Sequence, residues 1–209
     1  MSTYRTNLEL VGKFITRKGN QFEIKQPSFW LNDVTQANGT KRIEVAFKSI
    51  ANHIKLRQEV NNLCTVFQVD GNDGVFEKNG LPVEDITMFS FFEGRANDVK
   101  SVKTPGDCDC LIISKEWHFL EFKTDATSNN IQQANDNREK GEAQLAKSMS
   151  SFRARIKDDI IRYNCVLVVP PSFPKFKASM VNRSLKFLKK FDAPLYEVST
   201  SGIECYDLI

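Results

Sequence analysis

Three acidic residues and a lysine mark the ends of two short apolar segments in the middle of the chain. Asp107 and Asp109 come directly before the first segment, and Glu121 and Lys123 close the second. Charged side chains are rarely buried unless they are paired or bind a metal. Carboxylates suit Mg²⁺, and a bound Mg²⁺ polarises a phosphoryl oxygen and lowers the pKa of a bound water. These residue types therefore predict a metal site that cleaves a phosphodiester, at which the lysine stabilises the developing charge.

The turn between the two segments decides whether the acids meet. The segments indicate two β-strands, and alternate residues of a strand share a face, so Glu121 shares a face with Lys123. A two-residue loop would place Asp109 opposite Phe122, on the wrong face. A three-residue loop over 114–116 would place Asp109 directly across from Glu121. We therefore expect an odd loop length or a bulge between the strands.

The spacing of these residues resembles the active-site signature of the PD-(D/E)XK nuclease superfamily. That family includes restriction enzymes, Holliday-junction resolvases and many nucleases of DNA repair and phage defence. Asp109 is followed, after a gap of eleven residues, by Glu121-Phe122-Lys123, and the resemblance covers roughly residues 90–170. It implies an endonuclease that hydrolyses DNA with Mg²⁺, for which Mn²⁺ can substitute. Asp109, Glu121 and the backbone carbonyl of Phe122 would bind the metal, and Lys123 would be the catalytic lysine.

The resemblance also implies partners for these residues. The family often has a Gln or Lys facing the metal on the helix after the E-x-K strand, and Gln144 matches that place. Members often use a further acid from an upstream helix, for which Glu93 is the candidate, with Glu84 and Asp85 as rivals. Many such nucleases act as dimers, so a homodimer is an expectation. The resemblance does not extend to residues 1–80.

Alternatives stay open at this site. Cys108 stands where the family signature has Pro, and the additional Asp107 leaves open which aspartate binds the metal, although Asp109 leads directly into the apolar run. A surface Glu–Lys pair at the end of a solvent-facing hairpin would give the same pattern without any chemistry. The same fold could also serve as a catalytically silent nucleic-acid-binding or assembly module, or as an RNA-directed nuclease.

Residues 41–61 are predicted to form an amphipathic helix. Ile43, Phe47, Ile50 and Ile54 repeat at helical spacing and form one narrow stripe. The other side carries basic residues, which supply most phosphate contacts to DNA, although a solvated helix face is the ordinary interpretation. The candidate DNA-binding residues are Lys41, Arg42, Lys48 and Lys55.

The order of the remaining elements predicts an α/β fold with a central mixed sheet flanked by helices. Residues 1–37 indicate strands and turns, with a hairpin turn at 18–20, and residues 64–69 indicate a strand. From about residue 97 the expected order is three strands, a helix with a stripe over 145–160, a buried strand at 165–169, a helix at 175–191 and a terminal hairpin. We expect a restriction-endonuclease-like core over 81–209. Residues 1–80 would be an N-terminal hairpin and helix elaboration packed on that core in one compact domain.

Composition and cysteine usage narrow the class of protein further. The net charge of +3 neither requires nor excludes a nucleic-acid partner, since a basic surface can coexist with an acidic site. Five cysteines without a CxxC motif predict free thiols in a reducing compartment, and no apolar run suggests a signal peptide or membrane span, so we expect a cytoplasmic protein. No Gly-rich phosphate loop occurs, so any nucleotide-driven step would require a separate NTPase or specificity subunit.

Overall fold

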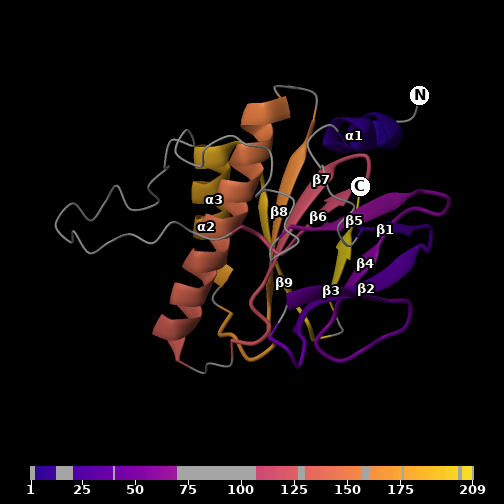
Figure 1. Cartoon of the computed structure of the whole chain (residues 1–209). Helices are drawn as coiled ribbons and strands as arrows, with labels where there is room; N and C mark the ends of the chain where they lie inside the picture. Colours follow the sequence, from indigo (N-terminus) through magenta and orange to yellow (C-terminus); the bar gives the residue numbers. More distant parts are fainter. Residues whose placement is uncertain are drawn as a thin grey trace.

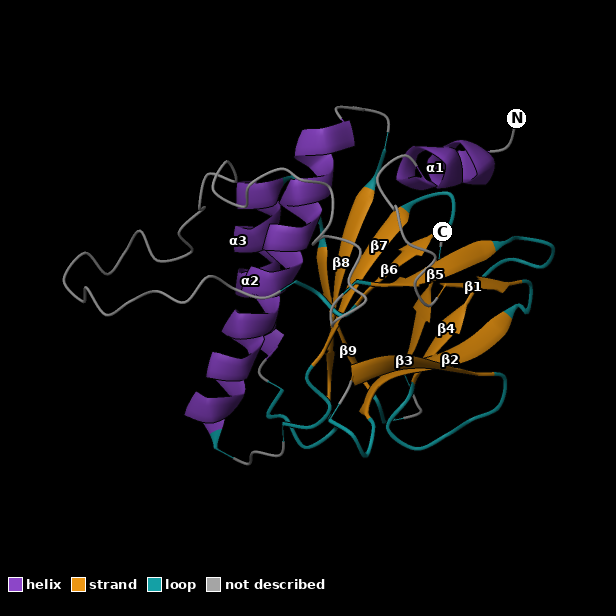
Figure 2. Cartoon of the chain, in the orientation of Figure 1, coloured by secondary structure: helices purple, strands orange, loops and turns teal. Residues whose placement is uncertain are grey.

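The computed structural model describes residues 3–12, 21–39, 41–69, 107–126, 130–156, 161–175, 177–201 and 204–208. Within these ranges the chain forms three helices and two mixed β-sheets arranged in layers (Figures 1 and 2). Two helices lie on one face of a six-stranded sheet, and a four-stranded sheet covers the other face. The α/β class predicted from the sequence is therefore confirmed, together with its central mixed sheet.

The six-stranded sheet contains the apolar strand that follows Asp109 and the apolar strand that contains Glu121. Its strands are β1 (Gln21–Ile24), β5 (Cys64–Gln68), β6 (Cys110–Ile113), β7 (Trp117–Phe122), β8 (Tyr163–Val169) and β9 (Leu195–Ser199). They lie in this order across the sheet, antiparallel as far as β7 and parallel from β7 to β9. Every residue of β6, β7 and β8 is buried, as expected for apolar strands covered on both faces.

Helices α2 (Ile131–Ile156) and α3 (Lys177–Phe191) make the crossovers that parallel neighbours require. α2 connects β7 to β8, and α3 connects β8 to β9. Met149 and Phe152 of α2 are buried, with Phe152 against the ring of Phe119 in β7 and Met149 against Cys165 in β8. This apolar stripe, predicted from the sequence, fixes which side of α2 faces the sheet.

The second sheet contains β2 (Ser28–Thr35), β3 (Lys41–Ala46), β4 (Ile54–Arg57) and β10 (Cys205–Asp207). Its order is β10-β4-β2-β3, with β10 parallel to β4 and the other neighbours antiparallel. Phe29 and Leu31 of β2 pack with Ile112 of β6 and Leu120 of β7 in one apolar cluster. Segments from both ends of the chain therefore build the layer that lies behind the central strands.

The helix predicted over 41–61 is wrong, because this segment forms β3 and β4. Ile43 and Ile54 are fully buried between the sheets, but Phe47, which was assigned to the same helical stripe, is 56% exposed. Gly39 lies in the turn between β2 and β3 and has a φ of 81°, a conformation that suits glycine. A hairpin turn directly before residue 41 therefore starts an antiparallel strand there instead of a helix.

Two further predictions fail near the chain ends. Residues 3–12, expected as strand or turn, form α1 (Thr3–Gly12), which buries Tyr4 and Val11 in the helix-side core. The predicted terminal hairpin is wrong, because β9 and β10 belong to different sheets. The predicted turn at 18–20, the strand at 97–103 and the division near residue 80 lie outside the described residues.

Candidate active site

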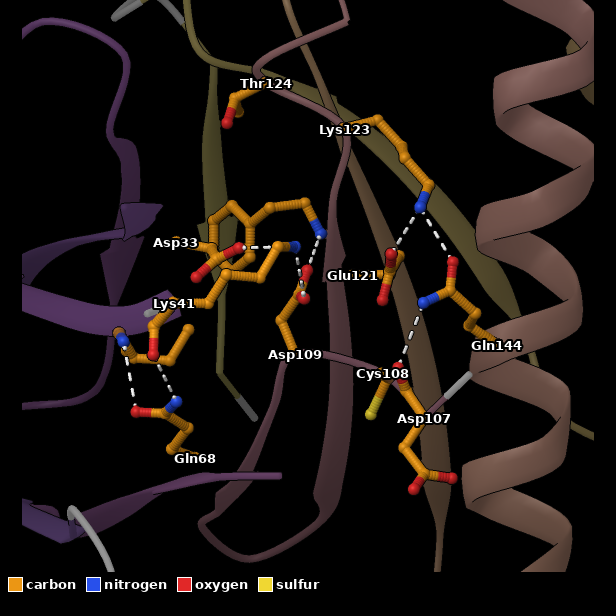
Figure 3. Close-up of polar contacts among 12 residues, drawn as sticks. Asp33, Lys41, Gln68, Asp107, Cys108, Asp109, Glu121, Lys123, Thr124 and Gln144 are labelled. Atoms are coloured by element: carbon orange, nitrogen blue, oxygen red, sulfur yellow. Dashed lines mark hydrogen bonds and ion pairs between the residues drawn. The ribbon is translucent and has the colours of Figure 1, made fainter. Parts of the chain in front are cut away.

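The last residues of β7 and the middle of α2 form a charged cluster on the helix side of the six-stranded sheet. The ammonium of Lys123 donates to Glu121 Oε1 at 2.5 Å and to Gln144 Oε1 at 2.7 Å. The Glu121 side chain is 1% exposed and that of Lys123 is 17% exposed. Figure 3 shows the three side chains pointing toward one another from the strand and the helix. The structure therefore brings together three of the four residues that the sequence predicted as catalytic.

Gly141 allows α2 to approach this cluster closely. A Cβ atom at this position would lie 3.3 Å from Lys123 Cε, 3.4 Å from Glu121 Cγ and 2.4 Å from Leu167 Cδ1. A glycine inside a helix costs about 1 kcal/mol relative to alanine. The close approach explains why the helix has a glycine here, one turn before Gln144.

The turn between β6 and β7 has the length that the site requires. It consists of residues 114–116, and the pairing of Cys110 with Leu120 continues to Ile113 with Trp117. Extending this register by one residue places the backbone of Asp109 across from that of Glu121. The predicted odd loop length is therefore confirmed, as a loop of three residues.

The carboxylate of Asp109 nevertheless does not lie with Glu121. The chain bends at Asp109, and the preceding Cys108 is buried in the helix-side core, where its N–H donates to Ser148 Oγ at 2.9 Å. The Asp109 carboxylate therefore faces the second sheet, where Oδ2 accepts the backbone N–H of Phe122 at 2.5 Å. In Figure 3, β7 runs between the Asp109 and Glu121 carboxylates. The expectation of one shared face is wrong, because strict alternation ends before the strand begins.

Asp107 lies beside α2. Its backbone carbonyl accepts a hydrogen bond from Gln144 Nε2 at 3.0 Å, and its carboxylate is 2.9 Å from the ammonium of Lys147. Gln144 therefore joins Lys123 to the segment that carries both candidate aspartates. The choice of metal-binding aspartate between Asp107 and Asp109 stays open, and Glu93 lies outside the described residues together with Glu84 and Asp85.

The donor types at this end of the sheet fit Mg²⁺, which prefers carboxylate and carbonyl oxygens. The nearly buried carboxylates of Asp109 and Glu121 each have a lysine ammonium nearby, from Lys41 at 3.8 Å and from Lys123 at 2.5 Å. Across the described ranges, no three Asp, Glu, His or Cys side chains are grouped as ready-made metal ligands. Metal binding by these carboxylates would therefore require at least one lysine ammonium to move away from the carboxylate that it contacts.

The four basic residues predicted to contact DNA do not share one face. Lys41 reaches two buried acids, whereas Arg42 and Lys48 are exposed. The ammonium of Lys55 lies over the ring of Trp30, 5.6 Å from its centroid. Because β3 and β4 replace the expected helix, these side chains come from two strands and a loop, and their contact with DNA stays a prediction.

Sequence reasoning missed Asp33, an almost fully buried acid in β2 whose Oδ2 lies 3.0 Å from the Lys41 ammonium. The signal was available, since Asn32-Asp33 interrupts an otherwise apolar strand. The neighbouring Asn32 Oδ1 accepts a hydrogen bond from Thr124, just after Lys123. The second sheet therefore contacts the end of β7 directly.

Histidine chemistry finds no support at the central strands. His118 is buried in β7, where its Nε2 is 3.1 Å from Ser114 Oγ and its Nδ1 is 3.0 Å from Tyr206 Oη. Burial lowers the pKa of His118 to about 3, because the charged imidazolium would be desolvated. Burial also raises the pKa of the Cys108 thiol well above its usual value. Both groups therefore stay neutral near pH 7.

Comparison with known proteins adds no assignment, since no family model, curated protein or solved structure matches this chain. No helix in the described part of the chain is both long and apolar enough to cross a membrane.

Proposed function

We propose that the protein is a metal-dependent endonuclease that hydrolyses phosphodiester bonds of DNA on a restriction-endonuclease-like core. The observation that carries this proposal is the contact among Glu121, Lys123 and Gln144. The acid and the lysine end a central strand, and the amide comes from the helix that follows it, as the resemblance to PD-(D/E)XK nucleases implies. The mixed sheet with helices on one face supports the same proposal.

Each residue of the cluster has a distinct role in this proposal. Lys123 stabilises the negative charge that develops on the phosphoryl oxygens, and Gln144 positions the Lys123 ammonium through its Oε1. Glu121, Asp109 and the carbonyl of Phe122 would supply oxygen ligands for Mg²⁺. Because the Asp109 and Glu121 carboxylates lie on opposite sides of β7, one of them would have to turn for both to reach the same ion. The bound Mg²⁺ would polarise the phosphoryl group and lower the pKa of the attacking water.

A silent binding or assembly module is the second candidate, and one observation favours it. The carboxylates of Asp109 and Glu121 already have ammonium partners, from Lys41 and Lys123. A buried acid that is permanently paired serves the fold instead of a metal. The two candidates differ in metal binding, because a silent module needs none.

The test is cleavage of a supercoiled plasmid and of a matched RNA by the purified chain with Mg²⁺, Mn²⁺ or EDTA. We expect metal-dependent DNA cleavage that falls about 100-fold or more in Lys123→Ala and Glu121→Gln, and about 10- to 100-fold in Gln144→Ala. Lys115→Ala is the matched control, since the Lys115 side chain is exposed and its ammonium pairs with the exposed Glu59.

The outcomes separate the candidates. Cleavage that survives in both Lys123→Ala and Glu121→Gln would place the activity elsewhere and refute the proposed site. A folded wild-type chain that neither cuts nor binds Mn²⁺ would support the silent module. Cleavage of RNA with intact DNA would make the protein an RNA-directed nuclease.

A further inference from the structure

A second charged cluster lies across β7 from Glu121, where the second sheet meets the central strands. Asp33 and Lys41 come from neighbouring strands of the second sheet, and Asp109 directly precedes β6. The ammonium of Lys41 is 3.0 Å from Asp33 Oδ2 and 3.8 Å from Asp109 Oδ1 (Figure 3). The carboxylates are 4% and 1% exposed, but the lysine side chain is 46% exposed. One solvent-accessible cation therefore lies between two buried anions.

The backbone beneath this lysine is fixed by Gln68, a buried residue at the end of β5. Gln68 Nε2 donates to the carbonyl of Lys41 at 2.9 Å, and the N–H of Ile43 donates to Gln68 Oε1 at 3.3 Å. A side chain of the six-stranded sheet thus holds the start of β3 beside Asp33 and Asp109. The backbone of Lys41 is held in place, while its exposed side chain can turn into solvent.

The charges of this cluster favour a cation of higher charge than an ammonium. Counted over these three described residues alone, Asp33, Asp109 and Lys41 sum to −1, and buried carboxylates are costly unless they are neutralised. Asp33 Oδ1 is also buried and has no hydrogen-bond partner among the described residues. A divalent cation neutralises two carboxylates and can take both oxygens of one, whereas the ammonium contacts a single oxygen of Asp33.

We propose that Asp33 and Asp109 form a divalent-cation site in which the ammonium of Lys41 occupies the cation position until a metal displaces it. The all-oxygen donor set selects Mg²⁺ or Mn²⁺ over softer metals. This site would hold the Asp109 ligand of the proposed nuclease together with a ligand from the second sheet, across β7 from Glu121. The proposal rests on the proposed function for the use of the metal in cleavage, but the binding of the metal is measured independently.

The experiment measures Mn²⁺ binding to the full chain by the loss of the free Mn²⁺ signal in electron paramagnetic resonance, together with Tm with and without Mn²⁺. Asp33→Asn should weaken binding at this site at least tenfold. Lys41→Met should tighten Mn²⁺ binding several-fold, because the competing ammonium is gone. Metal-free Lys41→Met should melt lower than wild type, and Mn²⁺ should raise its Tm more than it raises that of wild type. Lys115→Met, at an exposed lysine that pairs with the exposed Glu59, should match wild type in Mn²⁺ binding.

A purely structural ion pair gives the opposite pattern. If Asp33→Asn binds Mn²⁺ like wild type, or if Mn²⁺ fails to restore the Tm of Lys41→Met, the proposed site is overturned. The Lys41→Met arm decides the question if Asp33→Asn does not fold. A chain that cuts no DNA but loses Mn²⁺ binding in Asp33→Asn retains this site and refutes the nuclease. Cleavage that depends on Glu121, with Mn²⁺ binding that Asp33→Asn leaves unchanged, supports the nuclease and refutes this site.

Discussion

Gly141 shows how a single residue can control the position of the catalytic groups. An alanine there would gain about 1 kcal/mol of helix propensity. Its Cβ would clash with Leu167 and crowd Lys123, and overpacking of this kind costs about 1–3 kcal/mol. We therefore expect Gly141→Ala to lower Tm slightly and to reduce cleavage at least tenfold, as measured by thermal unfolding and by the plasmid assay.

Lys140→Ala is the control for Gly141→Ala, since Lys140 is exposed on the same turn of α2. It should keep wild-type Tm and activity. A Gly141→Ala protein that is more stable than wild type and fully active would show that α2 does not constrain the Lys123 ammonium.

The turn between β6 and β7 is the element that fixes the register of the site. Ser114 Oγ accepts the N–H of Glu116 at 3.2 Å and is 3.1 Å from His118 Nε2. Asn7 of α1 donates to the carbonyl of Lys115 at 3.0 Å, which holds the turn from outside. Removal of one partner leaves the other buried group unsatisfied, so Ser114→Ala should cost about 1–3 kcal/mol.

Chemical denaturation measures the effect of Ser114→Ala. Lys115→Ala, in the exposed part of the same turn, should change the free energy of unfolding by less than about 1 kcal/mol. Equal effects of the two substitutions would mean that the buried hydroxyl does not fix the turn.

The sequence predicted the register of β6 and β7 because apolar runs and loop length are local properties. It could not predict which way Asp109 points, because that depends on the contact of Cys108 with Ser148, forty residues further along the chain. It also mistook β3 for a helix, since the isoleucine spacing of a helix can arise by chance over two strands and a loop. Asp33 was missed for a related reason: its partner Lys41 is brought near only by the hairpin.

The whole molecule is held together across its layers by contacts that no local pattern reveals. His118 of β7, in the first sheet, is 3.0 Å from Tyr206 of β10, in the second. The two rings also meet edge to face, with centroids 5.6 Å apart. The C-terminal strand is therefore bound to the strand that ends in Glu121 and Lys123, so the stability of this contact bears on the site.

The burial of His118 predicts that the stability of the fold depends on pH. His118 has a pKa of about 3 in the folded chain, against an ordinary value of 6.5, because burial penalises its charged form. Between these values the unfolded chain binds a proton that the folded chain does not. Stability contributed by the neutral imidazole is therefore complete above about pH 6.5 and is lost as pH falls toward 3, by about 1.4 kcal/mol per pH unit.

Denaturant unfolding of wild type and His118→Gln between pH 4 and 7 tests this dependence, because all other groups titrate alike in both chains. The difference in their free energies of unfolding should shrink as pH falls.

Tyr206→Phe removes the hydrogen bond but keeps the ring that buries His118, so it should destabilise the fold while retaining most of the slope. A slope abolished by Tyr206→Phe would assign the effect to the hydrogen bond. Parallel curves for wild type and His118→Gln would show that folding does not change the pKa of His118. The expected result means that acid weakens the contact between β7 and β10, because protonation of the buried His118 would place an imidazolium between the two sheets.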